Sequence, residues 1–393
     1  MLRILILAPA YPYRGGLASF TEMLARSFTA RGEDVQIATF TLQYPQLLFP
    51  GKTQFSESPP PDGLRIIRLL NSVNPFNWIR TGIRIRRMQP DMLIVRYWTP
   101  FLSPSLGMVC RLARKNRHTT VLANVDNVVP HEQHFYDALL TRYFVRSVDG
   151  FLYMSQQVKD DLDRFTSRPA VFAPHPLFSN FGERVTREEA CLRLHLDPNH
   201  QYLLFFGLIR PYKGLDLMLD AWAMWRQQGG TAGRKLIVAG EFYTDPSKYL
   251  DRMERLGIRE DIILHDRFIK DNEVKYYFSL ADMLVQPYKS ATQSGVTQIA
   301  YHFETPMIVT RVGGLAEIVT DDKAGYVVPP DARQLSEAME KAFTGNNLKR
   351  FAENMKTEKQ RFSWEYFAEQ MMELYEKTKS VAAKTTVSVP PRL

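Results

Sequence analysis

Continuous apolar runs, rather than alternating ones, recur along the first half of the chain. They occupy residues 2–8, 35–40, 64–70, 92–97, 120–125 and 150–154. Segments with a helical spacing of apolar residues separate several of these runs, at 18–31, 104–115 and 133–146. Runs that are apolar throughout are typical of strands covered on both faces, and intervening helices favour a doubly wound parallel sheet of the α/β class.

A second series with the same organisation follows. Apolar runs lie at 202–206, 235–239, 262–265, 282–286, 307–310 and 325–328, with helical patterns at 215–226, 245–256, 272–280, 296–303 and 332–343. Three prolines between residues 169 and 176 separate the two series. The pattern therefore predicts one Rossmann-like domain at 1–175 and another at 176–362, followed by a helix at 363–380 and a tail at 381–393. The proline-rich stretch 43–62 is expected to be an irregular surface segment.

Composition narrows the class of protein. A length of 393 residues exceeds what one hydrophobic core usually supports, and 45% apolar with 23% charged residues is typical of a soluble globular chain. The net charge of +8 favours acidic ligands or anionic surfaces. The sequence has no stripe of basic residues interleaved with aromatic ones, which disfavours nucleic acid as the ligand. Cys110 and Cys191 lack metal-ligand spacing and fit a reducing cytoplasm. No apolar run is long enough to span a bilayer.

The first candidate site is the stretch 205–214, which follows a predicted strand and leads into the helix at 215–226. Arg210 and Lys213 lie in this loop. The N-terminus of the helix adds about half a positive charge, so the arrangement suits a diphosphate. The alternative is that both residues are ordinary solvated loop charges, which is the commoner case for such a pair taken alone.

Two further glycine-containing loops open helices. Ser294, Gly295 and Val296 follow the strand at 282–286 and predict a second anion site, although the loop could simply need Gly295 for a positive φ. Gly15 and Gly16 follow the first strand and would let backbone approach a phosphate or sugar, with a plain tight turn as the alternative. The pair is not the three-glycine dinucleotide fingerprint, which disfavours a nicotinamide-binding protein.

Two polar segments of the first domain have two interpretations each. His131 follows the strand at 120–125 and could exchange a proton with a reacting hydroxyl, or it could cap the next helix, and Asp126 has the same two interpretations. The segment 78–87 mixes Trp78 and isoleucines with four arginines. It could lie on an anionic membrane, or it could be a surface helix packed on its own sheet, which is the commoner case.

Taken together, these motifs resemble the retaining glycosyltransferases of family 4, the bacterial glycosyltransferase group 1 type, over nearly the whole chain. The resemblance rests on Gly15-Gly16, Gly207-x-x-Arg210-x-x-Lys213-Gly214, Ala281-Asp282, Pro306, Gly313-Gly314-x-x-Glu317 and Phe362-Ser363-Trp364. It implies the GT-B architecture, in which two Rossmann-like domains face a central cleft and the final helix packs back toward the first domain. It also implies that Arg210 and Lys213 hold the diphosphate of a donor and that Gly15 and Gly16 lie near its phosphate and sugar.

The chain departs from this family at one motif. Many members carry two glutamates separated by seven residues, and alignment on Pro306 places Ala291 and Ile299 there. Neither can make the expected polar contacts to sugar and ribose. The resemblance then leaves Gln293 and Gln298 as candidates for polar contacts to the donor, with Ser294, Gly295 and Val296 supplying backbone donors to its phosphates.

The resemblance implies metal-independent transfer of a hexose, with retention, from a nucleotide diphosphate sugar to an acceptor hydroxyl, with no cofactor. Its expected setting is polysaccharide or glycolipid assembly of the cell envelope, with a glycan or polyprenyl-linked acceptor, a cytoplasmic location and peripheral contact with the inner membrane face. The expected catalytic residues are His131, Asp126, Arg210 and Lys213. The alternatives are a non-catalytic nucleotide-sugar-binding protein and a GT-B sugar-nucleotide epimerase.

Overall fold

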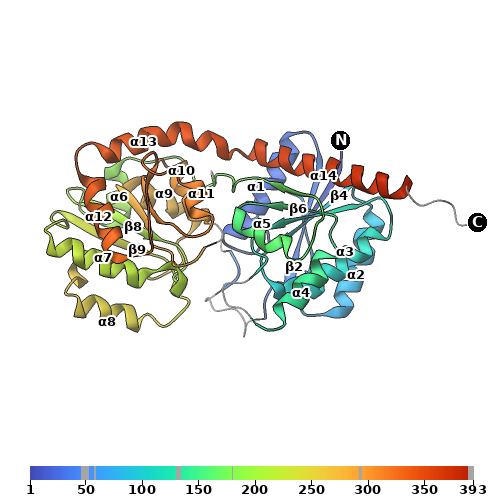
Figure 1. The fold of residues 1–393 in the computed structure, drawn as a ribbon, viewed down its shortest axis with the longest axis horizontal. Coiled ribbons are helices and arrows are strands. Elements are labelled where there is room, and N and C mark those ends of the chain that lie inside the picture. Colours follow the sequence, from blue (N-terminus) through green and yellow to red (C-terminus); the bar gives the residue numbers. More distant parts are fainter. Residues whose placement is uncertain (46–52, 57–58, 130–133, 179, 292–293, 388–393) are drawn as a thin grey trace, which may run out of the picture. The chain divides into compact units, whose positions relative to one another are not determined.

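The computed structural model describes residues 1–45, 53–56, 59–129, 134–178, 180–291 and 294–387. It divides into two compact units (Figure 1), one made of Met1–Pro174 with Trp364–Leu393 and the other of His175–Ser363. Each unit is an α/β sandwich around its own parallel sheet.

The first unit contains a seven-stranded sheet in the order β3-β2-β1-β4-β5-β6-β7. All its strand pairs are parallel. Because β1 pairs with both β2 and β4, the direction in which the sheet grows reverses between β1 and β4. The strands are β1 (Arg3–Leu7), β2 (Asp34–Leu42), β3 (Ile66–Asn71), β4 (Met92–Tyr97), β5 (Thr120–Val125), β6 (Gly150–Tyr153) and β7 (Ala170–Phe172).

Helices cover both faces of this sheet. Helices α1 and α14 pack on each other and on strands of one face, whereas α2, α3 and α4 form a second packed group (Figure 1). The core lies between them, where the ring of Tyr97 stacks on that of Phe144 at 4.1 Å. The helices are α1 (Gly16–Ala30), α2 (Pro75–Met88), η2 (Pro100–Leu102), α3 (Ser103–Arg114), α4 (Asp137–Val145), α5 (Gln156–Asp163) and α14 (Trp364–Val387).

The second unit contains a six-stranded parallel sheet in the order β10-β9-β8-β11-β12-β13. Here the direction of growth reverses between β8 and β11, which are neighbours in the sheet. The strands are β8 (Gln201–Phe206), β9 (Arg234–Ala239), β10 (Ile262–His265), β11 (Met283–Gln286), β12 (Met307–Thr310) and β13 (Gly325–Val328).

The helices of the second unit pack mainly in the pairs α7 with α12 and α6 with α9. Trp222 and Trp225 on α7 are fully buried and anchor this core. The helices are α6 (Arg187–Leu194), η3 (Pro211–Lys213), α7 (Leu215–Gln227), α8 (Ser247–Arg255), η4 (Arg259–Asp261), α9 (Asp271–Leu280), α10 (Gly295–His302), α11 (Leu315–Ile318), α12 (Ala332–Phe343), α13 (Asn347–Glu358) and η5 (Lys359–Phe362).

The predicted α/β class with two parallel Rossmann-like sheets is confirmed, because the continuous apolar runs form strands buried on both faces. Strand β7 was not predicted, since it is three residues long and follows a proline. The helix α14 was predicted to end near residue 380, but it continues to Val387. Of the predicted tail, residues 388–393 lie outside the described part of the chain, as do residues 46–52 and 57–58 of the predicted irregular segment.

No helix in the described part of the chain has the length and hydropathy needed to cross a membrane.

Candidate functional site

The reversal point of the second sheet positions two loops side by side. Strands β8 and β11 are hydrogen-bonded neighbours that run parallel, so the loops after Phe206 and Gln286 leave the same edge of the sheet. In open α/β sheets, ligands bind outside the carboxyl ends of the strands at this point. These loops contain Arg210 and Lys213 on one side and Ser294 and Gly295 on the other.

Close backbone contacts lock the two loops together. Gly214 has a φ of +72°, and a Cβ added there would lie 1.9 Å from the carbonyl oxygen of Pro287. The backbone N–H of Lys289 donates to the carbonyl of Tyr212 at 2.7 Å. A side chain at residue 214 would therefore push the two loops apart, which explains why the sequence has glycine at this position.

The two predicted anion sites meet at Gly207. A Cβ built on this glycine would lie 3.1 Å from Nζ of Lys213 and 3.4 Å from Cγ2 of Val296, and its φ is +103°. Val296 lies in the first turn of α10. The Lys213 ammonium and a side chain of the first turn of α10 therefore lie against the same residue, which brings the two predicted anion sites together.

Lys213 is partly buried, and its ammonium stays charged. Burial alone would lower its pKa, but the phenol oxygens of Tyr288 and Tyr212 and a hydrogen bond to Tyr288 outweigh this effect, so the pKa of Lys213 is raised above the ordinary lysine value. Its Nζ lies 5.3 Å from the centroid of the Tyr288 ring. The neighbouring ammonium of Lys213 in turn overcomes the effect of burial on Tyr288, whose pKa is lowered.

A buried chain of hydrogen bonds connects Lys213 to the start of α10. The hydroxyls of Tyr288 and Ser294 lie 3.4 Å apart, and Nε2 of Gln286 donates to Oγ of Ser294 at 2.9 Å. Oγ1 of Thr297 then donates to Oε1 of Gln286 at 2.9 Å. All of these side chains except that of Lys213 are at most 6% exposed. This row of hydrogen bonds fixes the first turn of α10 relative to the ammonium of Lys213.

The N-terminus of α10 is better suited to an anion than that of α7. The side chain of Ser294 bonds within the buried chain and does not cap α10, whose first turn carries no acidic residue. The first turn of α7, by contrast, carries Asp216, which pairs with Lys289 at 2.6 Å. The short helix η3 also separates Arg210 from α7. Of the two helix N-termini that the sequence predicts as anion sites, the geometry therefore favours that of α10 over that of α7.

Arg210 lies at the entrance to the same loop. Its Cζ is 4.9 Å from the centroid of the Tyr243 ring, and its side chain is partly exposed. Within the described ranges, neither Arg210 nor Lys213 forms an ion pair with a carboxylate. Two cations without carboxylate partners therefore lie at this edge of the sheet.

The remaining predicted donor contacts have different outcomes. Gln293 lies outside the described residues. Gln298 on α10 is fully buried, and neither polar atom of its amide has a hydrogen-bond partner among the described residues. Ala291 and Ile299, at the places of the family's glutamates, are each 6% exposed. Such a buried unpaired amide costs about 1–3 kcal/mol, so a partner that arrives with a ligand would relieve this penalty.

The reversal point of the first sheet contains Gly15 and Gly16. Gly15 follows β1 and directly precedes α1, with a φ of +92°. A Cβ added to Gly15 would meet nothing within 4 Å. Space is therefore open beside this backbone, and only the φ restricts the residue to glycine.

Asp126 is held in a buried ion pair. Its carboxylate accepts two hydrogen bonds from Arg96, at 2.7 and 3.1 Å, and both residues are 5% exposed. The guanidinium also lies 3.9 Å above the ring of Phe20. A carboxylate engaged in this way is poorly placed to accept a substrate proton, so the geometry favours the structural interpretation of Asp126. His131 lies outside the described residues.

Within the described part of the chain, no group of three His, Cys, Asp or Glu side chains comes together as a metal site. The positive charge at the candidate site is supplied by side chains and a helix N-terminus.

Sequence reasoning missed three polar residues of the site, namely Tyr288, Gln286 and Thr297. The apolar pattern predicts Gln286 only as the last residue of a buried strand, although an amide at the carboxyl end of a strand next to a polar loop is typical of a site residue. Tyr288 follows Pro287, which comes directly after this strand, so its place near the predicted loop could be inferred from the sequence. The hydrogen bond between Tyr288 and Lys213 could not be predicted, because it depends on the pairing of β11 with β8.

Two family models match the chain. Residues 15–177 match the glycosyl transferase 4-like domain, and residues 200–344 match the glycosyl transferases group 1 domain. The first match begins at Gly15, after β1, and the second contains both β8 and β11. Among curated proteins, the D-inositol 3-phosphate glycosyltransferase of Jonesia denitrificans is 26% identical over 206 residues, which is 51% of this chain and 48% of that protein. The chain spans about half the length of the curated relatives it matches.

Solved structures share the fold over nearly the whole chain. Sucrose-phosphate synthase from Thermosynechococcus elongatus has a TM-score of 0.73 at 19% identity, covering 96% of this chain and 100% of its own. HepE of Anabaena, solved with UDP and glucose, has a TM-score of 0.68 at 15% identity, covering 99% and 100%. With both family models matched in order along it, the chain belongs to the glycosyltransferases that join a glycosyl transferase 4-like domain to a group 1 domain.

Proposed function

We propose that this protein transfers a hexose from a nucleotide diphosphate sugar to an acceptor hydroxyl, with retention of configuration at the anomeric carbon. The observation that supports it most is the convergence at Gly207, where the Lys213 ammonium meets the first turn of α10. The HepE structure contains UDP and glucose, which makes a uridine diphosphate sugar the first donor to test.

The site would act by stabilising the leaving group. As the bond between the anomeric carbon and the phosphate oxygen breaks, negative charge grows on the diphosphate. Lys213, Arg210 and the N–H groups at the start of α10 are in place to receive it. Removal of one such donor typically costs about 10²–10³ in rate. These cations are part of the chain, so the proposal needs no metal.

Retention follows in this proposal from attack on the same face as the departing group. The acceptor oxygen forms its bond to the anomeric carbon while the phosphate bond breaks, and the hydroxyl proton passes to the leaving diphosphate. No carboxylate nucleophile is required. The pairing of Asp126 with Arg96 is compatible with this scheme, because no proton has to pass to that carboxylate.

The proposal includes the setting of the reaction. A positively charged chain of this family is suited to a glycan or polyprenyl-linked acceptor in cell-envelope assembly, with a cytoplasmic location and peripheral contact with the inner membrane face. The D-inositol 3-phosphate glycosyltransferases among its relatives make a phosphorylated polyol a second acceptor class to test.

Incubation with a panel of uridine, guanosine and adenosine diphosphate sugars tests the proposal. We expect one donor to release its nucleoside diphosphate, slowly with water and faster with acceptor, and nuclear magnetic resonance to show that the product keeps the anomeric configuration of the donor. Binding without release would favour a non-catalytic binding protein, and interconversion of the free donor would favour an epimerase. An inverted product would contradict retention alone.

A further inference from the structure

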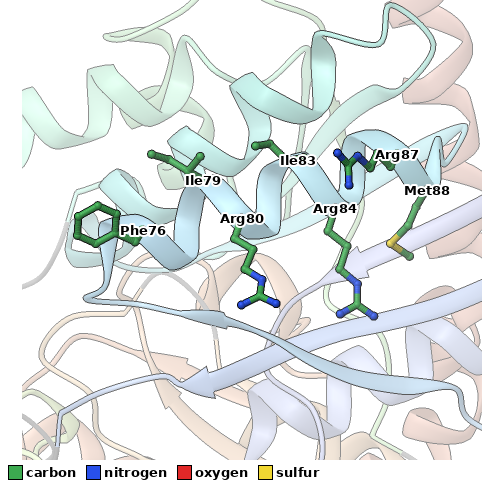
Figure 2. Close-up of a pocket in the computed structure, with 7 residues that line it drawn as sticks. All are labelled: Phe76, Ile79, Arg80, Ile83, Arg84, Arg87 and Met88. Atoms are coloured by element: carbon green, nitrogen blue, oxygen red, sulfur yellow. The ribbon is translucent and has the colours of Figure 1, made fainter.

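The exposed face of α2 combines apolar and basic side chains. Helix α2 (Pro75–Met88) begins at the capping residue Asn74, whose side chain accepts from the backbone of Asn77 at 3.2 Å. It contains four arginines and no acidic residue. A shallow hollow runs along it, lined mainly by Phe76, Ile79, Ile83 and arginines (Figure 2).

This helix is already anchored to its own unit by a different face. Thr81, Gly82 and Ile85 are buried, and the hydroxyl of Thr81 donates to the carbonyl of Leu69 on β3 at 3.1 Å. A Cβ added to Gly82 would lie 2.7 Å from Cβ of Leu112 on α3, so the two helices are in close contact. Packing on its own sheet therefore accounts for one stripe of α2 and leaves the other unexplained.

The second stripe is apolar but exposed to solvent. Phe76 is 85% exposed, Ile79 44% and Ile83 38%. These positions are spaced by three and four residues, so they lie along one side of the helix. Exposed apolar residues in such a row, rather than scattered singly, are typical of an interaction surface.

The arginines flank this row without partners of opposite charge. Arg80 and Arg84 project in one direction from α2, and Ile79 and Ile83 leave the helix in another (Figure 2). Within the described ranges, none of the four arginines forms an ion pair with a carboxylate. The surface therefore presents a concentrated positive charge beside an apolar row, which complements a surface that is anionic outside and apolar beneath.

We propose that this face of α2 docks onto the anionic surface of a phospholipid membrane. Phe76, Ile79 and Ile83 enter the boundary between head groups and acyl chains, while Arg80, Arg84 and Arg87 bind lipid phosphates. An interfacial helix is recognised by this combination of a basic flank and an apolar side. The inference gives a named surface to the membrane contact in the proposed function, and it does not depend on sugar transfer.

Flotation of the full chain with lipid vesicles tests this docking. The vesicles contain either phosphatidylcholine alone or phosphatidylcholine with phosphatidylglycerol. We expect binding only to the anionic vesicles. The double variant Arg80→Glu/Arg84→Glu should weaken it at least about tenfold, because each basic residue near an anionic surface contributes to attraction. Phe76→Ser should weaken it roughly tenfold, because one large apolar side chain no longer enters the lipid.

Matched controls lie in the other unit. Leu192 is 75% exposed, so Leu192→Ser removes an apolar side chain of similar exposure, and Arg193→Glu/Arg255→Glu reverses two exposed arginines. Both control variants should bind vesicles as the unchanged protein does. Circular dichroism melting checks that every variant is folded, and nucleoside diphosphate binding reports separately on the donor site.

Three results would overturn the proposal. Equal binding to both kinds of vesicle would show that the arginines are not involved. Undiminished binding by the folded α2 variants would place the contact elsewhere. Conversion of a dimer into monomers by Phe76→Ser, seen by light scattering, would show that the face joins two copies of the chain.

Discussion

The reversal points of the two sheets differ in whether their cations are paired with carboxylates. In the first unit, the cation Arg96 is paired with Asp126, and both are buried. In the second unit, Lys213 has a tyrosine beside it instead of a carboxylate, and Arg210 lies on the ring of Tyr243. The first arrangement is neutral and closed, whereas the second is positive.

This difference separates a structural pair from a binding site. A buried cation with a carboxylate partner is already satisfied, so a ligand anion gains little by approaching it. A phenol stabilises an ammonium without cancelling its charge, so the Lys213–Tyr288 pair keeps a positive charge for a ligand. The comparison predicts that changes in the first unit affect mainly folding and that changes in the second affect mainly donor binding.

Removal of the carboxylate in the first unit should have the largest effect. Asp126→Ala leaves Arg96 buried without its partner, which costs about 3–5 kcal/mol. We expect the melting temperature of the first unit to fall by roughly 10 °C. The double variant Arg96→Met/Asp126→Ala should recover much of this loss. Recovered stability with lost sugar transfer would instead support the catalytic role expected for Asp126.

Removal of the Lys213 ammonium in the second unit should lower the rate of sugar transfer. Lys213→Ala should lower kcat/KM for donor consumption by about 10²–10³, because it deletes one group that stabilises the leaving diphosphate. Lys289→Ala is the control, since this neighbouring lysine pairs with Asp216 on the partly exposed side of the same loop. Near-normal turnover by the folded Lys213→Ala protein would refute the diphosphate assignment.

The tyrosine partner of Lys213 predicts a pH dependence. The pKa of Lys213 is raised, so its ammonium is fully present at low and neutral pH and is lost only as the pH rises through a value above the ordinary 10.5. Tyr288→Phe removes the larger of the two tyrosine effects and leaves burial, which lowers the pKa of Lys213 relative to the unchanged protein. The pH at which the Lys213 amine becomes reactive toward an acylating reagent should therefore be lower in Tyr288→Phe. Identical profiles would show that Tyr288 does not hold the charge.

The smallest effect is expected at Gln298. Its fully buried amide has no partner among the described residues, so Gln298→Met removes a polar group of similar size at little cost. Chemical denaturation should show a change in the free energy of unfolding within about 1 kcal/mol. If the amide pairs with the donor, affinity should nonetheless decline. A large loss of stability with unchanged affinity would contradict this contact.

The sequence predicted the strands better than it predicted the site. Runs such as 120–125 and 307–310 coincide with β5 and β12, because both faces of each strand are buried and the apolar pattern is continuous. Arg210 and Lys213 were found because loop cations before a helix are a local signal. Their convergence with Val296 was not predictable, since it depends on the pairing of β8 with β11 across many residues of intervening chain.

The charge partner of Asp126 was also hidden from the sequence. Arg96 lies near the end of β4 and Asp126 follows β5, and only the parallel pairing of these strands brings them together. Read alone, each resembled a polar residue at the rim of a sheet. The general reason is that the apolar pattern of a sequence indicates which residues are buried. An ion pair between two strands depends instead on how those strands are paired and in which register.

Isothermal titration calorimetry with uridine, adenosine and guanosine diphosphates tests the central claim most directly. Both the unchanged protein and Lys213→Ala are titrated, with the corresponding monophosphates alongside. We predict that at least one diphosphate binds, that its monophosphate binds more weakly, and that Lys213→Ala removes this preference while Lys289→Ala keeps it. A preference for the diphosphate that survives in folded Lys213→Ala would contradict the account, as would the absence of binding by all three diphosphates.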